Sequence, residues 1–304
     1  MTDTVVFIGL GTMGRPMAGN LARLVPVQAY DVNPEATAAA ARHAGITAVA
    51  NPVDAIRSGS DPATVILMLP DSAIVHRALG DPDDATSFAS QLRQGSLVID
   101  MGSSNPQETK ILAERLRACG VAFVDAPVSG GRRKADTAEL TIMAGGPDAD
   151  FQRARPLLQA MGSSVTHVGP AGSAHALKAL NNLLSAIGIV GALEVLTVGK
   201  KFGLDPRVML EVINKSTGRN QATEVKIGPE VLDGRYGVGF SLALTVKDIT
   251  TALELSKSMG VPSEVSEACV RVCEAALGDL AESNPDQSEI ARYIAGVTGV
   301  ELGP

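Results

Sequence analysis

The sequence predicts an α/β fold, in which an N-terminal doubly wound sheet is followed by an all-helical domain entered through one long helix. Apolar, β-branched segments alternate with helical stretches through the first half, and a glycine-rich turn directly follows the first of them. Strand signals largely stop after Gly172. With 304 residues, 45% of them hydrophobic, the chain can bury the cores of two domains. We expect these domains to be residues 1–169 and 170–304.

The first strand and the turn after it carry the strongest signal. Residues 5–8, Val-Val-Phe-Ile, are typical of a strand buried on both faces, and G-x-G-x-x-G follows them without a spacer. Gly9 would allow the tight turn, Gly11 the approach of a pyrophosphate, and Gly14 the close packing of the next helix. This arrangement predicts the dinucleotide cradle of a Rossmann domain. The residues expected to contact the cofactor there are Gly9, Leu10, Gly11, Thr12, Met13 and Gly14.

An acidic residue stands where a dinucleotide fold needs one. Residues 27–30 read as a second strand, and Asp31 follows it, 22 residues after Gly9. A carboxylate at this place accepts hydrogen bonds from the adenosine ribose and repels a 2′-phosphate. The sequence therefore favours NAD over NADP, and Arg15 and Arg42 are the residues that keep NADP open.

Further strands are expected at the intervals that a doubly wound sheet needs. They cover residues 64–69, 96–99, 122–124, 140–144 and 165–168, with a helical stretch at 148–161. In such sheets ligands bind beyond the carboxyl ends of the strands. The loops at 70–72, 100–104 and 125–131 should therefore converge on the nicotinamide half of the cofactor, although each alone reads as an ordinary turn.

The second half is expected to be helical. Residues 173–202 contain no proline and carry apolar side chains at helical spacing, which predicts one helix of roughly 45 Å. Further helices should follow, separated by helix breaks at 203–206, 234–239 and 260–262. Lys178 and Asn182 would share a face of the long helix. Apolar neighbours favour a partly desolvated lysine suited to proton transfer, but spacing alone leaves a structural lysine equally open.

Composition excludes several classes of function. A formal net charge of −7 gives no broad basic field, so binding to nucleic acid or to a membrane surface is disfavoured. Three cysteines, at 119, 269 and 273, suit neither a disulfide framework nor a zinc site, and no H-E-x-x-H is present, so we expect no metal. We see neither a signal-peptide pattern nor an uninterrupted apolar run of membrane-spanning length, and expect a cytoplasmic protein.

The chain resembles a known family, the β-hydroxyacid dehydrogenases, typified by 3-hydroxyisobutyrate dehydrogenase. The resemblance runs nearly end to end, with the family's order and spacing. The segments that carry it are FIGLGTMGRPMAGNL, MLPDSAIV, DMGSSNP, DAPVSGG, GSAHALKALNN and FSLALTVKDITTALE.

The resemblance implies roles for residues outside the cradle. Leu69, Pro70 and Ser103 would contact the cofactor. Ser129, Gly130 and Gly131 would hold the substrate carboxylate. Lys178 would be the general acid/base and Asn182 would assist it. Phe240 would line the site from the second domain, Lys247 would close over cofactor and substrate, and Asp248 would be structural.

Two departures from the family pattern stand out. Basic residues 132–134 replace a small, glycine-containing segment, which indicates either recognition of a second anionic group or a solvated turn. Gly102 stands where serine is common, which weakens the expectation of hydrogen bonding at that loop. His175 is interpreted as a residue that tunes Lys178 or as a surface histidine. Arg219 and Asn220, together with Phe240, are expected to set the choice of substrate.

The predicted function is hydride transfer between NAD and a small β-hydroxy acid or its semialdehyde. An NADPH-dependent semialdehyde or glyoxylate reductase of the same superfamily and a non-catalytic NAD-binding scaffold stay open as alternatives. Imine reductases resemble this architecture but usually lack the lysine, and 6-phosphogluconate dehydrogenases have a much longer helical half. The expected partners are a small anionic hydroxy acid and further copies of the chain, in a homodimer or homotetramer, because the long helix is apolar around much of its circumference.

Overall fold

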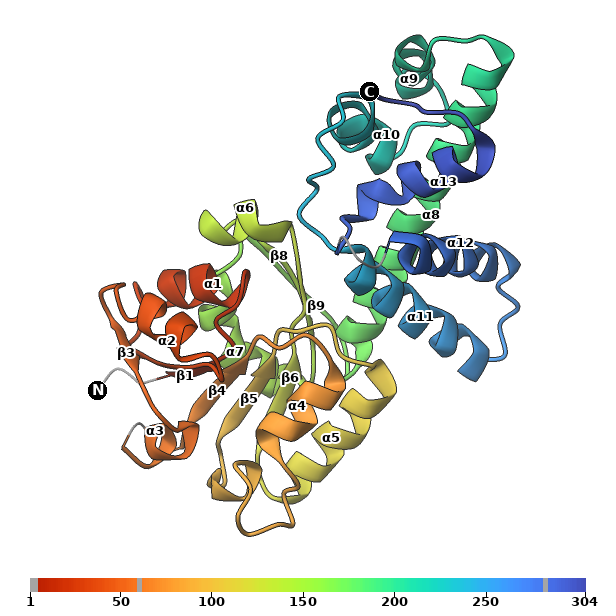
Figure 1. Cartoon of the computed structure of the whole chain (residues 1–304). Helices are drawn as coiled ribbons and strands as arrows, with labels where there is room; N and C mark the ends of the chain where they lie inside the picture. The colour runs from red at the N-terminus through yellow and green to blue at the C-terminus, as the bar shows by residue number, and fades with distance from the viewer. Residues whose placement is uncertain (1–4, 59–61, 281–283) are drawn as a thin grey trace. The chain divides into compact units, whose positions relative to one another are not determined.

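The structure is a computed structural model of the chain that describes residues 5–58, 62–280 and 284–304 (Figure 1). It contains two compact units. The first unit is Met1–Lys178 and the second is Ala179–Pro304. The boundary falls inside one long helix, which belongs to both units.

The first unit is built on a nine-stranded sheet in the order β3-β2-β1-β4-β5-β6-β8-β7, with β9 beside β8. The strands are β1 Val5–Ile8, β2 Val27–Tyr30, β3 Ile46–Ala48, β4 Thr64–Leu67, β5 Leu97–Asp100, β6 Ala122–Asp125, β7 Val128–Ser129, β8 Thr141–Gly145 and β9 Ser164–Gly169. From β3 to β6 all pairs are parallel, whereas β8 runs antiparallel to β6 and β7. The register pairs Leu67 with Asp100, and Asp100 with Asp125. The loops after β4, β5 and β6 therefore leave the sheet at one edge.

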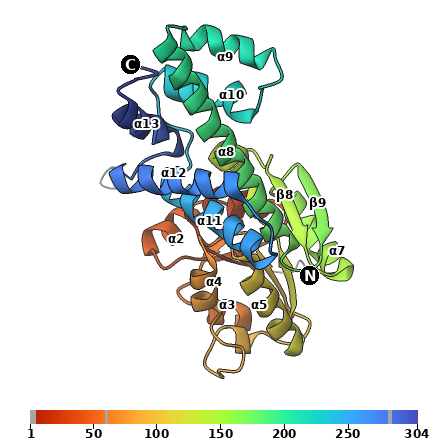
Figure 2. The same cartoon turned by 90° about the vertical axis from the view of Figure 1, so that its right-hand side faces the viewer.

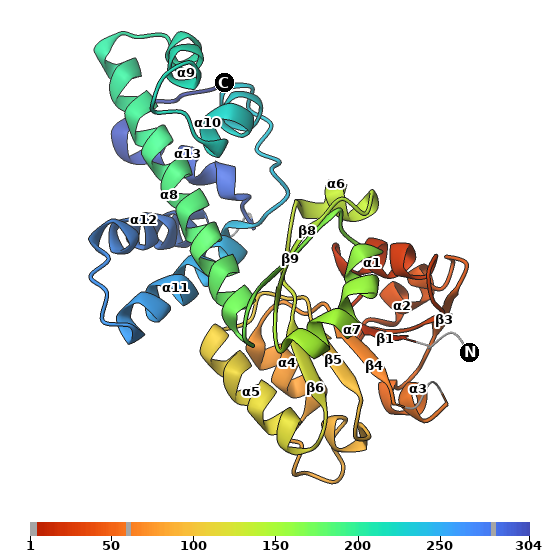
Figure 3. The same ribbon diagram turned by 180° about the vertical axis from the view of Figure 1, so that it is seen from behind.

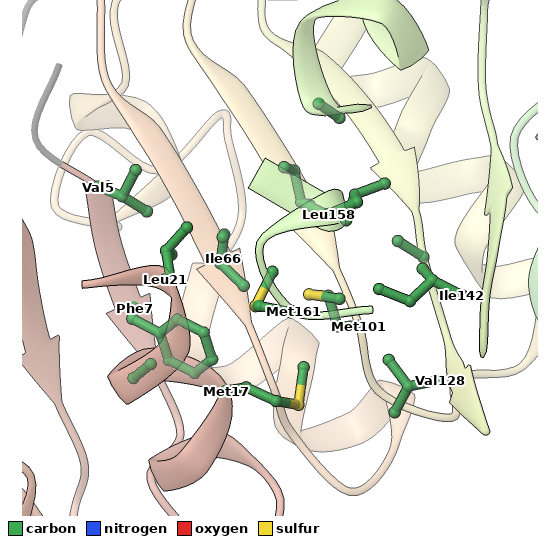
Figure 4. Close-up of a cluster of buried hydrophobic side chains, with 14 of the residues drawn as sticks. Val5, Phe7, Met17, Leu21, Ile66, Met101, Val128, Ile142, Leu158 and Met161 are labelled. Atoms are coloured by element: carbon green, nitrogen blue, oxygen red, sulfur yellow. The ribbon is translucent and has the colours of Figure 1, made fainter. Parts of the chain in front are cut away.

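Helices cover both faces of this sheet (Figures 1 and 3). They are α1 Gly14–Leu21, α2 Pro34–Ala40, α3 Pro52–Ser58, α4 Ser72–Leu79, the 3-10 helix η1 Ala89–Gln91, α5 Pro106–Ala118, α6 Gly131–Asp136 and α7 Asp148–Gln159. Successive residues of β1 point to opposite faces of the sheet, and each face packs against its own layer of helices. Phe7 belongs to a buried cluster with Met17 of α1 and Leu158 of α7 (Figure 4), whereas Val6 belongs to a cluster that includes α4 and α5. Burial on both faces accounts for the uninterrupted apolar run at 5–8.

The predicted α/β fold is confirmed, with some local differences. The strand expected at 64–69 ends at Leu67. Three elements were not expected: β3, β7 and α6. The basic segment 132–134 lies on α6, so the interpretation as a turn was wrong. An Arg132–Asp136 pair, four residues apart with Nε–Oδ1 at 2.8 Å, suits this short helix.

The second unit is helical in the described part of the chain. Its helices are α8 Ser173–Phe202, which begins in the first unit, α9 Pro206–Asn214, α10 Gln221–Val225, the π-helix η2 Ile227–Leu232, α11 Leu242–Ser258, α12 Glu264–Leu280, the 3-10 helix η4 Gln287–Glu289 and α13 Ile290–Thr298. These helices are seen from the side in Figure 2. Their buried side chains form one core that includes Leu193, Leu242 and Ile290. Cys269 and Cys273 are free and buried in this core, as expected of small apolar residues.

Helix α8 matches the predicted helix at both ends. It stops before Gly203, whose φ of +106° suits glycine, and before Pro206. By its length and its mean hydropathy of 1.7, α8 could also cross a membrane, which was not expected from the sequence. Half of its most apolar 18-residue window is buried inside the protein.

Candidate active site

The loop between β1 and α1 has the shape of a dinucleotide cradle. Gly9 has a φ of +98°, and a Cβ there would collide with the carbonyl oxygen of Met68. A Cβ on Gly14 would collide with the carbonyl oxygen of Gly9. A Cβ on Gly11 would instead meet nothing within 4 Å. Gly9 and Gly14 are thus required by the turn itself, and Gly11 leaves the space through which a pyrophosphate approaches.

Asp31 holds this loop in place. Its Oδ2 accepts a hydrogen bond of 2.6 Å from the amide of Leu10, and its Oδ1 accepts one of 2.8 Å from the amide of Asn33. Helix α1 starts with no side-chain cap from the described residues. The amides of Arg15 and Met17 in its first turn bond to the carbonyl oxygens of Gly11 and Met13, so the helix offers a phosphate mainly the positive end of its dipole. The glycine turn at 9–14, the carboxylate of Asp31 and the start of α1 therefore fit a bound dinucleotide.

The loops after β4 and β5 pack against each other. The amide of Gly102 donates to Asp100 Oδ1 over 2.9 Å, and a Cβ on Gly102 would collide with the carbonyl oxygen of Leu69. This contact explains why glycine stands where serine is common. Pro70 is exposed and Ser103 is half-buried, so both loops present residues at the carboxyl edge of the sheet.

The predicted substrate loop joins β7 to α6. Ser129 is half-buried, and Gly130 and Gly131 are exposed with φ of +134° and +66°. A Cβ on Gly131 would meet nothing within 4 Å. The two glycines expose backbone amides in a conformation that other residues rarely adopt, which suits the binding of a carboxylate.

Asp125 ties the end of β6 to the start of α8. It is fully buried, and its two carboxylate oxygens accept hydrogen bonds from the amides of Gly172, Ala174 and His175 at 2.8, 3.0 and 2.9 Å. The carboxylate therefore serves as the N-terminal cap of α8 and suits the positive end of the helix dipole. From sequence, Asp125 was predicted only as part of a loop, because its hydrogen-bond partners lie 47–50 residues away.

His175 is buried beside this cap, so its interpretation as a surface histidine was wrong. Its side chain is 1% exposed, and Nδ1 lies 2.8 Å from the hydroxyl of Thr109 on α5. Nε2 lies 3.8 Å from Asp100 Oδ2, which also accepts a hydrogen bond of 2.7 Å from Ser104. His175 thus packs the first turn of α8 against the loop after β5, one turn before Lys178.

Lys178 is the last residue of the first unit and is half-buried on α8. One turn further along the helix, in the second unit, the side-chain amide of Asn182 donates to Asp248 Oδ2 over 2.6 Å. Lys247 Nζ lies 2.9 Å from the other oxygen of Asp248, which is 4% exposed. Buried Asp248 therefore orients both Asn182 and Lys247, which confirms that it pairs locally.

Phe240 is fixed through its backbone. Asp286 Oδ2 accepts hydrogen bonds from the amides of Gly239 and Phe240 at 2.8 and 3.1 Å, a role that the sequence analysis missed. Asn220 is used as a helix cap, because its Oδ1 accepts hydrogen bonds from two amides at the start of α10. A role of Asn220 in substrate choice stays a prediction.

Fold and cradle together define a class of protein, the dinucleotide-dependent dehydrogenases with a Rossmann domain and a helical second unit. Among the residues that the structure describes, no group of three or more His, Cys, Asp or Glu side chains could hold a metal ion.

Comparison with known proteins gives the family. Residues 4–169 match the NAD binding domain of 6-phosphogluconate dehydrogenase, and residues 172–294 match the NAD-binding domain of NADP-dependent 3-hydroxyisobutyrate dehydrogenase. The 2-(hydroxymethyl)glutarate dehydrogenase of Eubacterium barkeri is 35% identical over 97% of this chain and 96% of its own length. Human mitochondrial 3-hydroxyisobutyrate dehydrogenase is 36% identical over 85% of this chain and 77% of its own length.

A solved structure agrees with these matches. The 3-hydroxyisobutyrate dehydrogenase of Mycobacterium tuberculosis, described with L-serine, superposes with a TM-score of 0.86 at 28% identity, over 97% of this chain and 99% of its own. The chain belongs to the β-hydroxyacid dehydrogenase family and is an NAD(P)-dependent hydroxyacid dehydrogenase.

Proposed function

We propose that this dehydrogenase oxidises a small β-hydroxy acid of the 3-hydroxyisobutyrate type to its semialdehyde with NAD, and that Lys178 is the general acid/base. The observation that carries the proposal is the placement of Lys178. The helix that bears it starts on the buried carboxylate of Asp125, in the same segment as the loop at 129–131. Asp125 thus fixes the start of the helix that carries Lys178, and it precedes the proposed carboxylate-binding loop in the sequence.

Each group has a defined task in this mechanism. The Ser129 hydroxyl and the amides of Gly130 and Gly131 hold the substrate carboxylate. Lys178 takes the proton of the hydroxyl during oxidation and returns it during reduction, when its ammonium also stabilises charge on the carbonyl oxygen. Asn182, oriented by Asp248, hydrogen-bonds the substrate oxygen. The bound dinucleotide supplies the hydride acceptor at its nicotinamide C4.

The choice of NAD rests on Asp31. Its carboxylate stands at the end of β2, where the adenosine ribose binds in dinucleotide folds, and would repel a 2′-phosphate. Leu69, Pro70, Ser103 and Lys247 are assigned to the cofactor as well. An NADPH-dependent semialdehyde or glyoxylate reductase is the second candidate, because residues 172–294 match the domain of an NADP-dependent 3-hydroxyisobutyrate dehydrogenase.

Steady-state rates test the proposal. NAD and NADP would each be offered with 3-hydroxyisobutyrate, 3-hydroxypropionate, D-glycerate, L-serine and 2-(hydroxymethyl)glutarate, and NADPH with the semialdehydes and glyoxylate. Reduction of NAD by one of the hydroxy acids, at a kcat/KM well above that with NADP, is expected. Faster turnover of NADPH with an aldehyde would favour the second candidate, and binding of NADH without any turnover would favour a scaffold.

We further propose that the protein is a homodimer or homotetramer and resides in the cytoplasm. Apolar side chains of α8 remain exposed, with Leu184 at 71%, Val198 at 70% and Phe202 at 83%. Packing such residues against a second copy would remove them from water. Light scattering of the purified protein should give a mass of two or four chains, and a monomer would contradict this part of the proposal. Fractionation of the producing cells tests the location.

A further inference from the structure

The first unit contains a basic cavity of about 560 Å³ between α1, the end of α2 and α6. Four arginines line it: Arg15 on α1, Arg23 and Arg42 in the turns after α1 and α2, and Arg132 on α6. His43 and one acidic residue, Asp136, also line it. The cavity is therefore strongly positive in a chain whose formal net charge is −7.

Most of this charge is not neutralised within the protein. Arg132 pairs with Asp136 through hydrogen bonds of 2.8 and 2.9 Å. Arg15, Arg23 and Arg42 make no ion pair with the part of the chain that the structure describes. Gathering three such guanidinium groups around one hollow costs electrostatic free energy that a bound anion would recover. The arrangement thus points to a ligand.

The cavity is separate from the predicted reaction site. Its lining includes none of the residues of the cradle at 9–14, of the substrate loop at 129–131, or Asp31, in the described part of the chain. Arg15 and Gly19 are spaced by four residues on one face of α1, and Arg23 follows in the turn after that helix. The hydrogen bond of 2.7 Å from the Asn20 side chain to the carbonyl oxygen of Ala135 fixes α6 against α1. The cavity wall is therefore held together by packed helices.

We propose that this cavity binds a small molecule with two or more anionic groups, phosphate or carboxylate, as a site distinct from cofactor and substrate. Guanidinium groups bind both anions through paired hydrogen bonds. Three guanidinium groups without an ion-pair partner among the described residues favour a ligand with several negative charges over a small monovalent anion. The volume falls within the range of about 300–1,000 Å³ typical of small-molecule sites.

The test is calorimetric and independent of turnover. Inorganic pyrophosphate and citrate would be titrated separately into the protein saturated with NADH, so that the dinucleotide cradle is filled, with acetate as the single-charge comparison. Saturable binding of pyrophosphate or citrate, one per chain, is expected, and acetate should bind much more weakly. Pyrophosphate alone would indicate a phosphorylated ligand, and citrate alone a polycarboxylate.

Two kinds of variant locate the binding. The double variant Arg23→Gln/Arg42→Gln should weaken it at least about tenfold, because each charged hydrogen bond is worth about that factor. The matched control Arg117→Gln/Arg155→Gln removes two exposed arginines from α5 and α7 and should leave it unchanged. Gly19→Leu keeps every charge but fills the cavity, since a Cβ at Gly19 points at His43 from 3.5 Å. It should also abolish binding.

Three results would overturn the proposal. The first is no saturable binding of either probe, and the second is an equal loss of affinity in the control double variant. The third is full affinity in both Gly19→Leu and Arg23→Gln/Arg42→Gln, which would place the probe elsewhere. NADH affinity, measured for each variant, shows that the first unit is folded.

Discussion

At the scale of single residues, the local motif could be predicted and its distant partners could not. The roles of the cradle glycines could be predicted from sequence, because the tight turn, the approach of the pyrophosphate and the packing of α1 all involve the same six residues. The structural roles of Asp125 and His175 could not be predicted from sequence. Their hydrogen-bond partners lie 47 and 66 residues away, and only the fold brings them together. The catalytic roles of Lys178 and Asn182 stay predictions.

Asp125 offers a first test at this scale. Asp125→Asn replaces one of two oxygens that accept three buried amide hydrogens with a donor, and so leaves at least one amide unsatisfied. The free energy of unfolding should fall by about 1–3 kcal/mol, measured by urea denaturation. Asp279→Asn, at an exposed position of α12, is the control and should change little. Equal stability of the two variants would argue against the cap.

Asp31 offers a second test. Asp31→Asn keeps an oxygen for the Leu10 amide but removes the charge that repels a 2′-phosphate. The ratio of kcat/KM with NAD to kcat/KM with NADP should fall by about tenfold or more. The variant loses the charged hydrogen bond to the ribose of NAD and no longer repels the 2′-phosphate of NADP. The comparison variant Asp205→Asn changes a carboxylate that caps α9, outside the cradle and the loops assigned to the cofactor, and should leave this ratio unchanged. A ratio that stays unchanged in Asp31→Asn would mean that Asp31 does not face the ribose.

At the scale of elements, length decided what could be predicted. Helix α8 was placed at both ends because thirty residues without proline and a following glycine leave little choice. Three short elements were missed. β3 has three residues, β7 has two and α6 has six, and the two strands are held by pairing with β2 and β8 rather than by their own periodicity.

The segment between α10 and η2 gives a prediction for pH. Burial lowers the pKa of Lys226 below the usual value of a lysine, and the charge of Asp286 opposes the shift in part. The Lys226 ammonium also donates a hydrogen bond of 3.1 Å to Ser185. Between the lowered native pKa and the usual value of about 10.4, the unfolded chain binds more protons at this site. This residue therefore makes the free energy of unfolding rise with pH in that window.

The comparison of wild type with Lys226→Met isolates this contribution. The free energy of unfolding of the wild type minus that of Lys226→Met should increase as pH rises toward 10, because only the wild type carries the buried ammonium. Lys215→Met, which alters an exposed lysine, gives the reference for a solvated side chain. A difference that is flat or falls with pH would show that Lys226 keeps an ordinary pKa.

At the scale of the whole molecule, the change in composition after Gly172 was enough to predict a sheet-based half and a helical half. The reversal at the edge of the sheet was not predicted. β8 runs antiparallel to β6, and this direction is set by pairing across the sheet rather than by any pattern inside residues 141–145. The two family matches, at 4–169 and 172–294, divide the chain in the same region as the change in composition.

The most direct test of the account is the kcat/KM for NAD reduction by the best hydroxy acid of the panel, measured for wild type and Lys178→Ala. If Lys178 transfers the proton, the variant should lose about 10²- to 10⁴-fold in kcat/KM and keep its affinity for NADH. Lys201→Ala, on the same helix and exposed, should retain full activity. Wild-type turnover by Lys178→Ala would contradict the central claim that this lysine is the acid/base.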